Sequence, residues 1–284
     1  MTTTGATSRA PDESQRLAAC ARPTGRPVMY QQWSDLLFLH WEYSAAVIQA
    51  TLPEGLFVDT FDGKAYLGVV PFFMRKIRPR FLSAVPGILD FLELNLRTYV
   101  HDRAGVPGVW FYSLDANQWL AVKVARTLFY LPYEHATMSA SVTPRAAGNG
   151  CEVDFRSRRA GEEDESRFSY QTPAETKAKE AKRGSLEFFL VERYRLFAWD
   201  GRGGRLFSGR VHHTPYQITT DPQVTWSDQT MALAGFDVDG RAPEHVAAAR
   251  AVDVEIWPLK QVAERVRCES ESGESLGIGA GAPA

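Results

Sequence analysis

Long hydrophobic runs are missing from this sequence of 284 residues. No stretch approaches the roughly 20 consecutive apolar residues that a membrane-spanning helix needs, so no membrane partner is expected. Residues 1–25 are polar and lack the apolar segment of a secretory signal peptide. Together these two absences predict a protein that stays in the cytoplasm.

The sequence also has few cysteines and no excess of positive charge. The three cysteines, Cys20, Cys151 and Cys268, are odd in number and widely spaced, which fits free thiols in a reducing compartment rather than a disulfide framework or a metal site. The 32 Lys and Arg residues stand against 34 Asp and Glu, for a formal net charge of −2. Because phosphate binding needs a basic surplus, nucleic acid is not expected as the main partner.

Material for a packed core is plentiful, with 44% hydrophobic and 12% aromatic residues. The two ends of the chain differ from the rest, since they are rich in small and polar residues without a sustained apolar period. We therefore expect a disordered leader over residues 1–28 and a disordered tail over residues 266–284. The part between them, residues 29–265, is predicted to form a single domain.

Turn signals separate many short apolar runs, which predict nine to eleven strands with two or three helices among them. Asp62-Gly63 and Asp200-Gly201 are typical of tight hairpin turns, because this pair readily takes positive φ angles. A doubly wound parallel sheet would instead show a regular alternation of strand and helix. The pattern favours an α+β fold that is mainly an antiparallel β-barrel with two or three short helices.

The stretch 91–100 (FLELNLRTYV) alternates strictly between apolar and polar residues. On a strand, Glu93, Asn95, Arg97 and Tyr99 share one face. Alternation usually means that the polar face is in water, and this interpretation stays open. However, a carboxylate, an amide, a guanidinium and a phenol form a self-complementary hydrogen-bonding set. If the strand belongs to a closed barrel, this face lines its interior.

Such a strand face can bind a small molecule and also transfer protons to or from it. In a low-dielectric interior, Arg97 can hold a carboxylate through two parallel hydrogen bonds, and Glu93 can act as acid or base. The competing interpretation is a structural network, in which Asn95 would bridge the other two, because they are roughly 13 Å apart along a strand. We take Glu93 as the candidate catalytic residue, and Asn95, Arg97 and Tyr99 as candidates for substrate binding.

Two further short motifs add candidates for substrate binding. Tyr133, Glu134 and His135 are consecutive, so on a strand only one of the last two can face inward; a hydrogen-bonded structural histidine is the alternative to a proton shuttle. His212 and His213 diverge on a strand and have no third ligand at metal spacing, so no metal is predicted and His213 is expected near the pocket mouth. No nucleotide-binding motif or nucleophile elbow is present, and no cofactor is expected.

Four runs carry a resemblance to a known family: FLELNLRTYV (91–100), GVWFYSLDANQWLAVKVARTLFYLPYEHATM (108–138), GSLEFFLVERYRLF (184–197) and VHHTPYQI (211–218). Together they resemble the YqjF-like bacterial family, a domain of unknown function, over about residues 29–260. This family is grouped with the acetoacetate decarboxylase-like fold. The resemblance therefore implies a single barrel domain with a polar internal cavity.

The same resemblance implies which chemistry is lost. Acetoacetate decarboxylase forms a Schiff base on a lysine that lies beside a second lysine, and these two places fall on Tyr133 and Glu134 here. Neither residue can form an imine, and the effect of paired cations on a lysine pKa is absent. The cavity glutamate of the decarboxylase falls near Glu93, in agreement with the choice made from the residues alone.

Three functions follow for this chain. The first is an enzyme without Schiff-base lysine chemistry that acts on a small anionic or carbonyl-bearing metabolite. The second is a barrel that binds or senses such a molecule without converting it, and the third is a structural protein whose polar strand is merely solvated. A small molecule is the expected partner, and both a monomer and a homo-oligomer fit the sequence.

Overall fold

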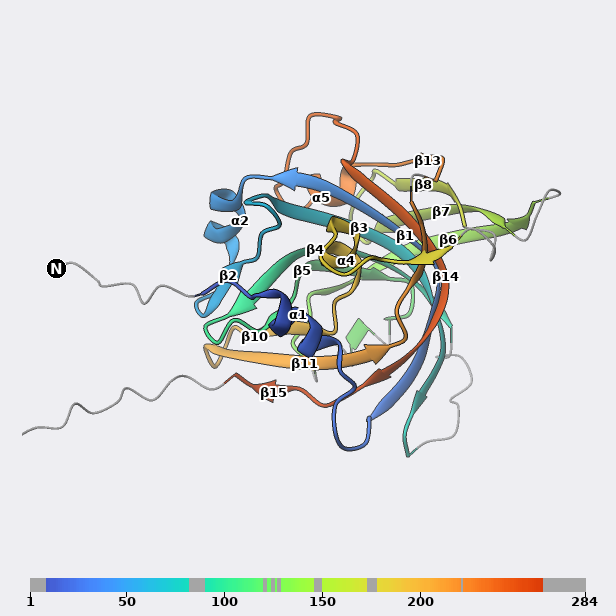
Figure 1. Cartoon of the computed structure of the whole chain (residues 1–284). Coiled ribbons are helices and arrows are strands. Elements are labelled where there is room, and N and C mark those ends of the chain that lie inside the picture. Colours follow the sequence, from blue (N-terminus) through green and yellow to red (C-terminus); the bar gives the residue numbers. More distant parts are fainter. Residues whose placement is uncertain are drawn as a thin grey trace, which may run out of the picture.

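The protein is represented by a computed structural model that describes residues 9–81, 90–119, 122, 123, 126, 129–145, 150–172, 178–220 and 222–262 (Figure 1). The strands are β1 (Met29–Tyr43), β2 (Leu56–Val58), β3 (Ala65–Pro79), β4 (Phe91–Asp102), β5 (Pro107–Ala116), β6 (Tyr133–Pro144), β7 (Cys151–Arg159), β8 (Ser166–Gln171), β9 (Lys179–Glu180), β10 (Arg195–Asp200), β11 (Arg205–His213), β12 (Gln217–Thr220), β13 (Val224–Thr225), β14 (His245–Ile256) and β15 (Lys260–Gln261). The helices are α1 (Glu13–Cys20), α2 (Ala45–Thr51), α4 (Leu186–Val191) and α5 (Gln229–Ala232). Among the described helices, none has the length and apolar character needed to cross a membrane.

The strands form one mixed sheet, in the order β13-β8-β7-β6-β5-β10-β11-β14-β1-β3-β4-β2. Strand β5 pairs in parallel with β6 and with β10, whereas the other strand pairs are antiparallel. Because β4 also pairs with β5, the hydrogen-bonded path β4-β3-β1-β14-β11-β10-β5 returns to its starting strand. The prediction of an α+β fold dominated by β-strands is confirmed, but the sheet is mixed rather than purely antiparallel. The described residues form fifteen strands and four helices, more than the nine to eleven strands and two or three helices predicted, because several strands are only two to four residues long.

The predicted hairpin at Asp62-Gly63 is confirmed. Both residues have positive φ angles, 49° and 79°, as a two-residue turn of this kind requires. Phe61 and Lys64 form a bridge across the turn. The hairpin leads the chain into β3, whose register with β4 places Phe72 opposite Glu93.

Part of the predicted disordered leader is helical. Helix α1 begins with a capping box, in which the Asp12 side chain accepts a hydrogen bond from the Gln15 backbone and the Gln15 side chain accepts one from the Asp12 backbone. The helix has no buried residues, so it carries no apolar period for a sequence pattern to reveal. Polar contacts attach it instead, above all two hydrogen bonds of 2.6 Å from Arg16 to Asp59. The predicted tail over 266–284 lies outside the described residues.

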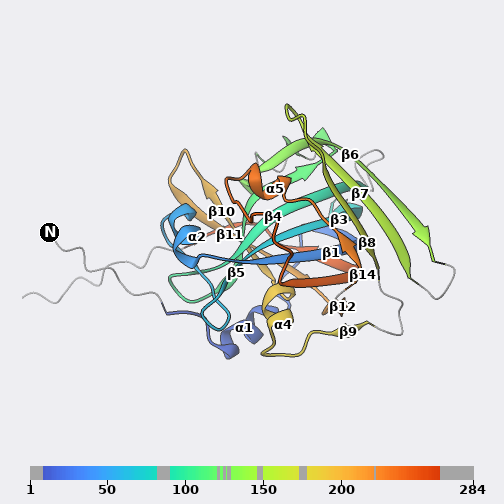
Figure 2. The same cartoon turned by 90° about the horizontal axis from the view of Figure 1, so that it is seen from above.

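Two hydrophobic clusters lie on the two faces of β4, and every residue of this strand is buried. Leu92, Leu94 and Leu96 belong to a cluster with Phe155 and Phe168 of β7 and β8. The opposite face of β4 turns towards the second cluster, which lies within the ring of strands. Figure 2 shows β6, β7 and β8 on one side of this ring, and α1 and α4 on the other. The solvated polar face that alternation usually indicates is therefore absent from β4.

Candidate functional site

A cavity of about 150 Å³ lies within the ring of strands. This is close to the size of an apolar cavity that accepts benzene, so the cavity suits a small metabolite. Its wall is mostly aliphatic and aromatic. The polar and charged side chains on the wall are Glu93, Asn95, Arg97, Tyr133, Arg193, Arg195 and Tyr216.

Glu93 and Tyr133 are hydrogen-bonded to each other on the cavity wall. The Tyr133 hydroxyl donates a 2.8 Å hydrogen bond to Oε2 of Glu93. The two residues meet because β5 lies between β4 and the start of β6, with Glu93 opposite Ala116 and Tyr133 opposite Leu114. Burial, assisted by the charge of Asp115, raises the pKa of Glu93 to about 7, although hydrogen bonds from Tyr133 and Asn95 act in the opposite direction. Near neutral pH this carboxyl group can therefore both accept and donate a proton.

Arg97 is a buried cation, 9% exposed. Its Nη2 donates to the Leu190 carbonyl at 3.2 Å and to the Tyr99 hydroxyl at 3.4 Å, and its guanidinium lies 5.7 Å from the centre of the Phe38 ring. No carboxylate of the described residues lies within 4.0 Å of it. Its Nε has no hydrogen-bond partner there either. Because a buried charge without a partner is costly, this guanidinium is suited to an anion.

Asn95 lies between Glu93 and Arg97 on the same strand face, and it is 4% exposed. Its side-chain oxygen has no hydrogen-bond partner among the described residues. Two residues of the same strand face thus each keep one unmatched polar atom, an acceptor on Asn95 and a donor on Arg97.

Tyr99 does not line the cavity; it lies behind Arg97 in a buried polar chain. Its hydroxyl is 2.6 Å from Nε2 of His40, and Nδ1 of His40 is 2.9 Å from Nδ1 of His245. Burial, together with the nearby His245 and Arg97, holds the pKa of His40 well below its usual value. This chain of Tyr99, His40 and His245 contains no carboxylate, so it leaves the charge of Arg97 uncompensated.

His213 also stays behind the cavity wall. Its ring lies 4.5 Å from the rings of both Tyr194 and Tyr216, measured between centres. The Nδ1 atom is 2.7 Å from the Thr214 carbonyl, so Nδ1 carries the proton and Nε2 is the basic nitrogen. Burial lowers the pKa of His213 to about 4. Tyr216 lines the cavity and His213 does not, so His213 supports the cavity wall by packing against the Tyr216 ring.

Glu134 and His135 do not reach the cavity, in contrast to their predicted role. The alternation of β6 turns Tyr133 inward and Glu134 outward, where Glu134 pairs with Arg126 at 2.6 Å and its side chain is 42% exposed. His135 is exposed because β6 then leaves the ring: from Ala136 onwards it pairs with β7. Only the first residue of this strand therefore belongs to the site.

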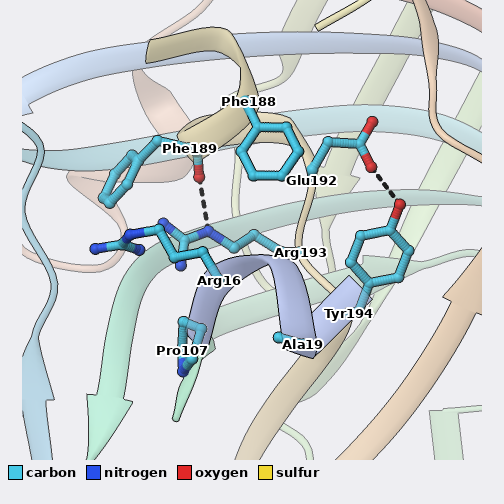
Figure 3. Close-up of a pocket in the computed structure, with 8 residues that line it drawn as sticks. All are labelled: Arg16, Ala19, Pro107, Phe188, Phe189, Glu192, Arg193 and Tyr194. Atoms are coloured by element: carbon cyan, nitrogen blue, oxygen red, sulfur yellow. Dashed lines mark hydrogen bonds between the residues drawn. The ribbon is translucent and has the colours of Figure 1, made fainter. Parts of the chain in front are cut away.

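Arg193 is a site residue that the sequence patterns miss. It follows α4 and donates through Nε to the Phe189 carbonyl and through Nη1 to Asp59. It lines the cavity and also a small second pocket of about 10 Å³, which Arg16 lines as well (Figure 3). Figure 3 shows the two arginines beside the ring of Phe189. An isolated arginine after a short helix gives no periodic signal, so only the folded structure places it here.

The donor set of the cavity does not suit a metal ion. Among the described residues, no group of three or more His, Cys, Asp or Glu side chains is arranged to hold one. The cavity wall contains no lysine within that part of the chain. A guanidinium-rich wall with a single carboxyl group instead suits an organic anion.

Comparison with known proteins agrees with this architecture. A model of the family DUF2071, described as an uncharacterized conserved protein, matches residues 30–253. The uncharacterized protein YqjF of Bacillus subtilis strain 168 is 34% identical over 239 residues, which cover 84% of this chain and 94% of YqjF. These matches confirm the predicted resemblance to the YqjF-like family.

Solved structures share the fold at low sequence identity. The enduracididine biosynthesis enzyme MppR complexed with pyruvate has a TM-score of 0.57 at 13% identity, covering 84% of this chain and 91% of that one. An acetoacetate decarboxylase-like enzyme from Sphingomonas wittichii RW1 has a TM-score of 0.55 at 15% identity, covering 84% and 94%. The acetoacetate decarboxylase of Legionella pneumophila has a TM-score of 0.53 at 12% identity, covering 86% and 92%. The chain therefore has an acetoacetate decarboxylase-like fold.

Proposed function

Because the chain belongs to the DUF2071 family of uncharacterized conserved proteins, we propose its function from the chemistry of its own cavity. The protein is an enzyme of the cytoplasm that acts on a small carboxylate bearing a carbonyl group, without forming an imine. The ring of strands serves as a closed barrel within a domain of residues 29–265, and the cavity is its interior. The observation that carries the proposal is that Arg97 is a buried cation on the cavity wall, and no carboxylate of the described residues lies within 4.0 Å of its guanidinium group.

In this proposal each polar side chain has one task. Arg97 binds the ligand carboxylate, and Asn95 orients the ligand through its amide. Glu93 removes a proton from the carbon beside the carbonyl group and returns it, so that the carbon–hydrogen electron pair passes into an enolate and back. Tyr133 holds the Glu93 carboxylate by the hydrogen bond already described. Tyr99 positions Arg97 from behind.

Binding without turnover is the second candidate. It is favoured by the hydrogen bond between Tyr133 and Glu93, which stabilises the carboxylate and weakens it as a base. Exchange of the methyl hydrogens of pyruvate with deuterated water separates the two functions. An enzyme of the proposed kind accelerates this exchange, whereas a binding protein leaves its rate unchanged.

The first test is the stabilisation of the protein by a small 2-oxo acid. We expect pyruvate at millimolar concentration to raise the melting temperature by a few degrees, because a ligand that binds only the native state stabilises it. Arg97→Gln should remove this shift, since the anion loses its counter-ion. Arg103, an exposed arginine paired with Glu54, gives the matched control Arg103→Gln, which should keep the full shift. An equal pyruvate shift in Arg97→Gln and the wild type would disprove the assigned role of Arg97.

The second test concerns covalent chemistry. We expect no adduct when the protein is treated with pyruvate and borohydride, because Tyr133 and Glu134 stand where the decarboxylase has its lysines and the described cavity wall has none. Intact-protein mass spectrometry measures the result, with a Schiff-base aldolase as the positive control. A mass increase that maps to any lysine of the chain would refute this part of the proposal.

A further inference from the structure

Two arginines of the cavity wall each keep one guanidinium nitrogen without a hydrogen-bond partner in the described structure: Nε of Arg97 and Nη2 of Arg193. Both residues are buried, with exposed fractions of 9% and 8%. A buried donor on a charged group is costly when it is left unmatched. Two different arginines of the wall therefore have hydrogen-bonding capacity that the described residues leave unused.

The two guanidinium groups lie near the same aromatic ring. Their central carbons lie 5.6 Å and 4.9 Å from the centre of the same Tyr99 ring. They can thus be separated by no more than the sum of these two distances. Because a carboxylate carbon lies roughly 4 Å from the guanidinium carbon that binds it, a chain of three or four carbon atoms can span the two cations.

The charge balance around the cavity also calls for more than one anionic group. Arg16, Arg97, Arg193 and Arg195 carry four positive charges, against Asp59 and, above its pKa of about 7, Glu93. Asp59 is shared by Arg16 and Arg193, so it does not neutralise both. Burial of uncompensated charge is unfavourable, and a ligand with a single negative charge would leave part of this excess in place.

We infer that the ligand of this cavity is a short dicarboxylate, with one carboxylate on the guanidinium group of Arg97 and the other on the guanidinium group of Arg193. The inference rests on the proposed function, because it concerns the same cavity, and it names the class of substrate. A cavity of about 150 Å³ holds a molecule of this size. The two anionic ends then fix the ligand in one orientation across the wall that carries Glu93.

The test compares succinate with butyrate, two four-carbon acids that differ in one carboxylate. At pH 8 both are fully ionised, and isothermal titration calorimetry on the full chain measures their affinities. We expect succinate to bind at least roughly tenfold more tightly, since a buried ionic hydrogen bond is worth a factor of this order. Equal affinities would overturn the inference, while the binding of butyrate would still support the proposed function.

Variants of Arg193 assign the second carboxylate. Arg193→Lys keeps the charge and the ion pair with Asp59 but loses the planar set of donors, so it should fold and should lose most of the preference for succinate. Its affinity for butyrate should stay within about twofold of the wild type. Arg103→Lys is the control and should retain the preference. An unchanged preference in Arg193→Lys would exclude Arg193 as the second anchor.

Failure of the proposed function gives a different result. In that case neither succinate, butyrate nor pyruvate binds or changes the melting temperature, and the inference falls with it. A preference for succinate that survives in Arg97→Gln and disappears in Arg103→Lys would place the dianion on the outer surface, which would also overturn the inference.

Discussion

Replacement of Asp59 by asparagine should lower the free energy of unfolding by about 3–5 kcal/mol, the usual cost of removing one partner from a buried ion pair. The Asp59 side chain is fully buried and accepts hydrogen bonds from Arg16 and Arg193 at 2.6 Å and 3.0 Å. Asparagine has nearly the same shape but no charge, so the variant isolates the electrostatic loss. Arg193 then remains buried without a counter-ion, while Arg16 can turn towards solvent.

The effect of Asp59→Asn should depend on pH with a definite sign. Burial alone would raise the pKa of Asp59, but the hydrogen bonds and charges of Arg16 and Arg193 outweigh it and lower the pKa below its ordinary value of 3.8. The stability that this carboxylate contributes is therefore complete above pH 4 and is lost as the pH falls through the folded-state pKa. Urea denaturation at pH 7 and pH 3 measures both values, and the difference between variant and wild type should shrink at pH 3.

Glu54→Gln is the matched control for Asp59→Asn. It makes the same change from carboxylate to amide in an ion pair with Arg103, but the Glu54 side chain is 86% exposed. Surface ion pairs contribute little, so stability should stay close to that of the wild type. If Asp59→Asn were as stable as Glu54→Gln, the shared carboxylate would not hold α1 and Arg193 together in the way described.

Replacement of Glu93 by glutamine should stabilise the protein by about 3 kcal/mol at pH 8, if each unit of pKa shift is worth about 1.4 kcal/mol. The pKa of Glu93 is raised from 4.5 to about 7, chiefly by burial. Between these two values the folded state holds a proton that the unfolded state has released, so the stability of the wild type falls as the pH rises from about 4.5 to about 7. Glutamine does not titrate and still accepts the hydrogen bond from Tyr133.

The gain from Glu93→Gln should therefore be small at pH 5 and reach its full size at pH 8. Thermal and urea unfolding at both values measure it, and the same variant should abolish the deuterium exchange of pyruvate. Glu134→Gln provides the control, because this neighbouring carboxylate lies at the surface in an ion pair with Arg126 and its effect should be small at both values. A gain that does not change with pH would contradict the burial of an ionisable Glu93.

The alternation of residues 91–100 predicted that Glu93, Asn95 and Arg97 share a face, and the structure places all three on one cavity wall. The period of a strand is local, so one sequence suffices to find it. Whether that face is wet or enclosed depends on strands far away in the chain. Both faces of β4 are buried. A buried strand with one polar face has the same alternating sequence as a half-exposed strand, so the pattern alone does not distinguish them.

Other parts of the site depend on distant pairs that no local pattern encodes. Arg97 contacts the carbonyl of Leu190, 93 positions further along the chain, and Arg16 reaches Asp59 across 43 positions. The capping box of α1 is visible in the sequence, but the helix has no apolar face to indicate where it docks. The prediction that one of Glu134 and His135 faces inward assumed that β6 stays in the ring, and the turn of this strand towards β7 could not be foreseen from the residues.

One face of strand β4 lines the cavity and the other packs into a separate hydrophobic cluster, so that cluster also influences the shape of the cavity. The leucines on the outer side of β4 pack against Phe155 and Phe168, at the close density of a protein core. A change in their volume displaces the backbone that also carries Glu93 and Arg97. The selectivity of the cavity is thus set in part by side chains that never touch a ligand, and the outer layer of strands acts as the rigid backing of the binding wall.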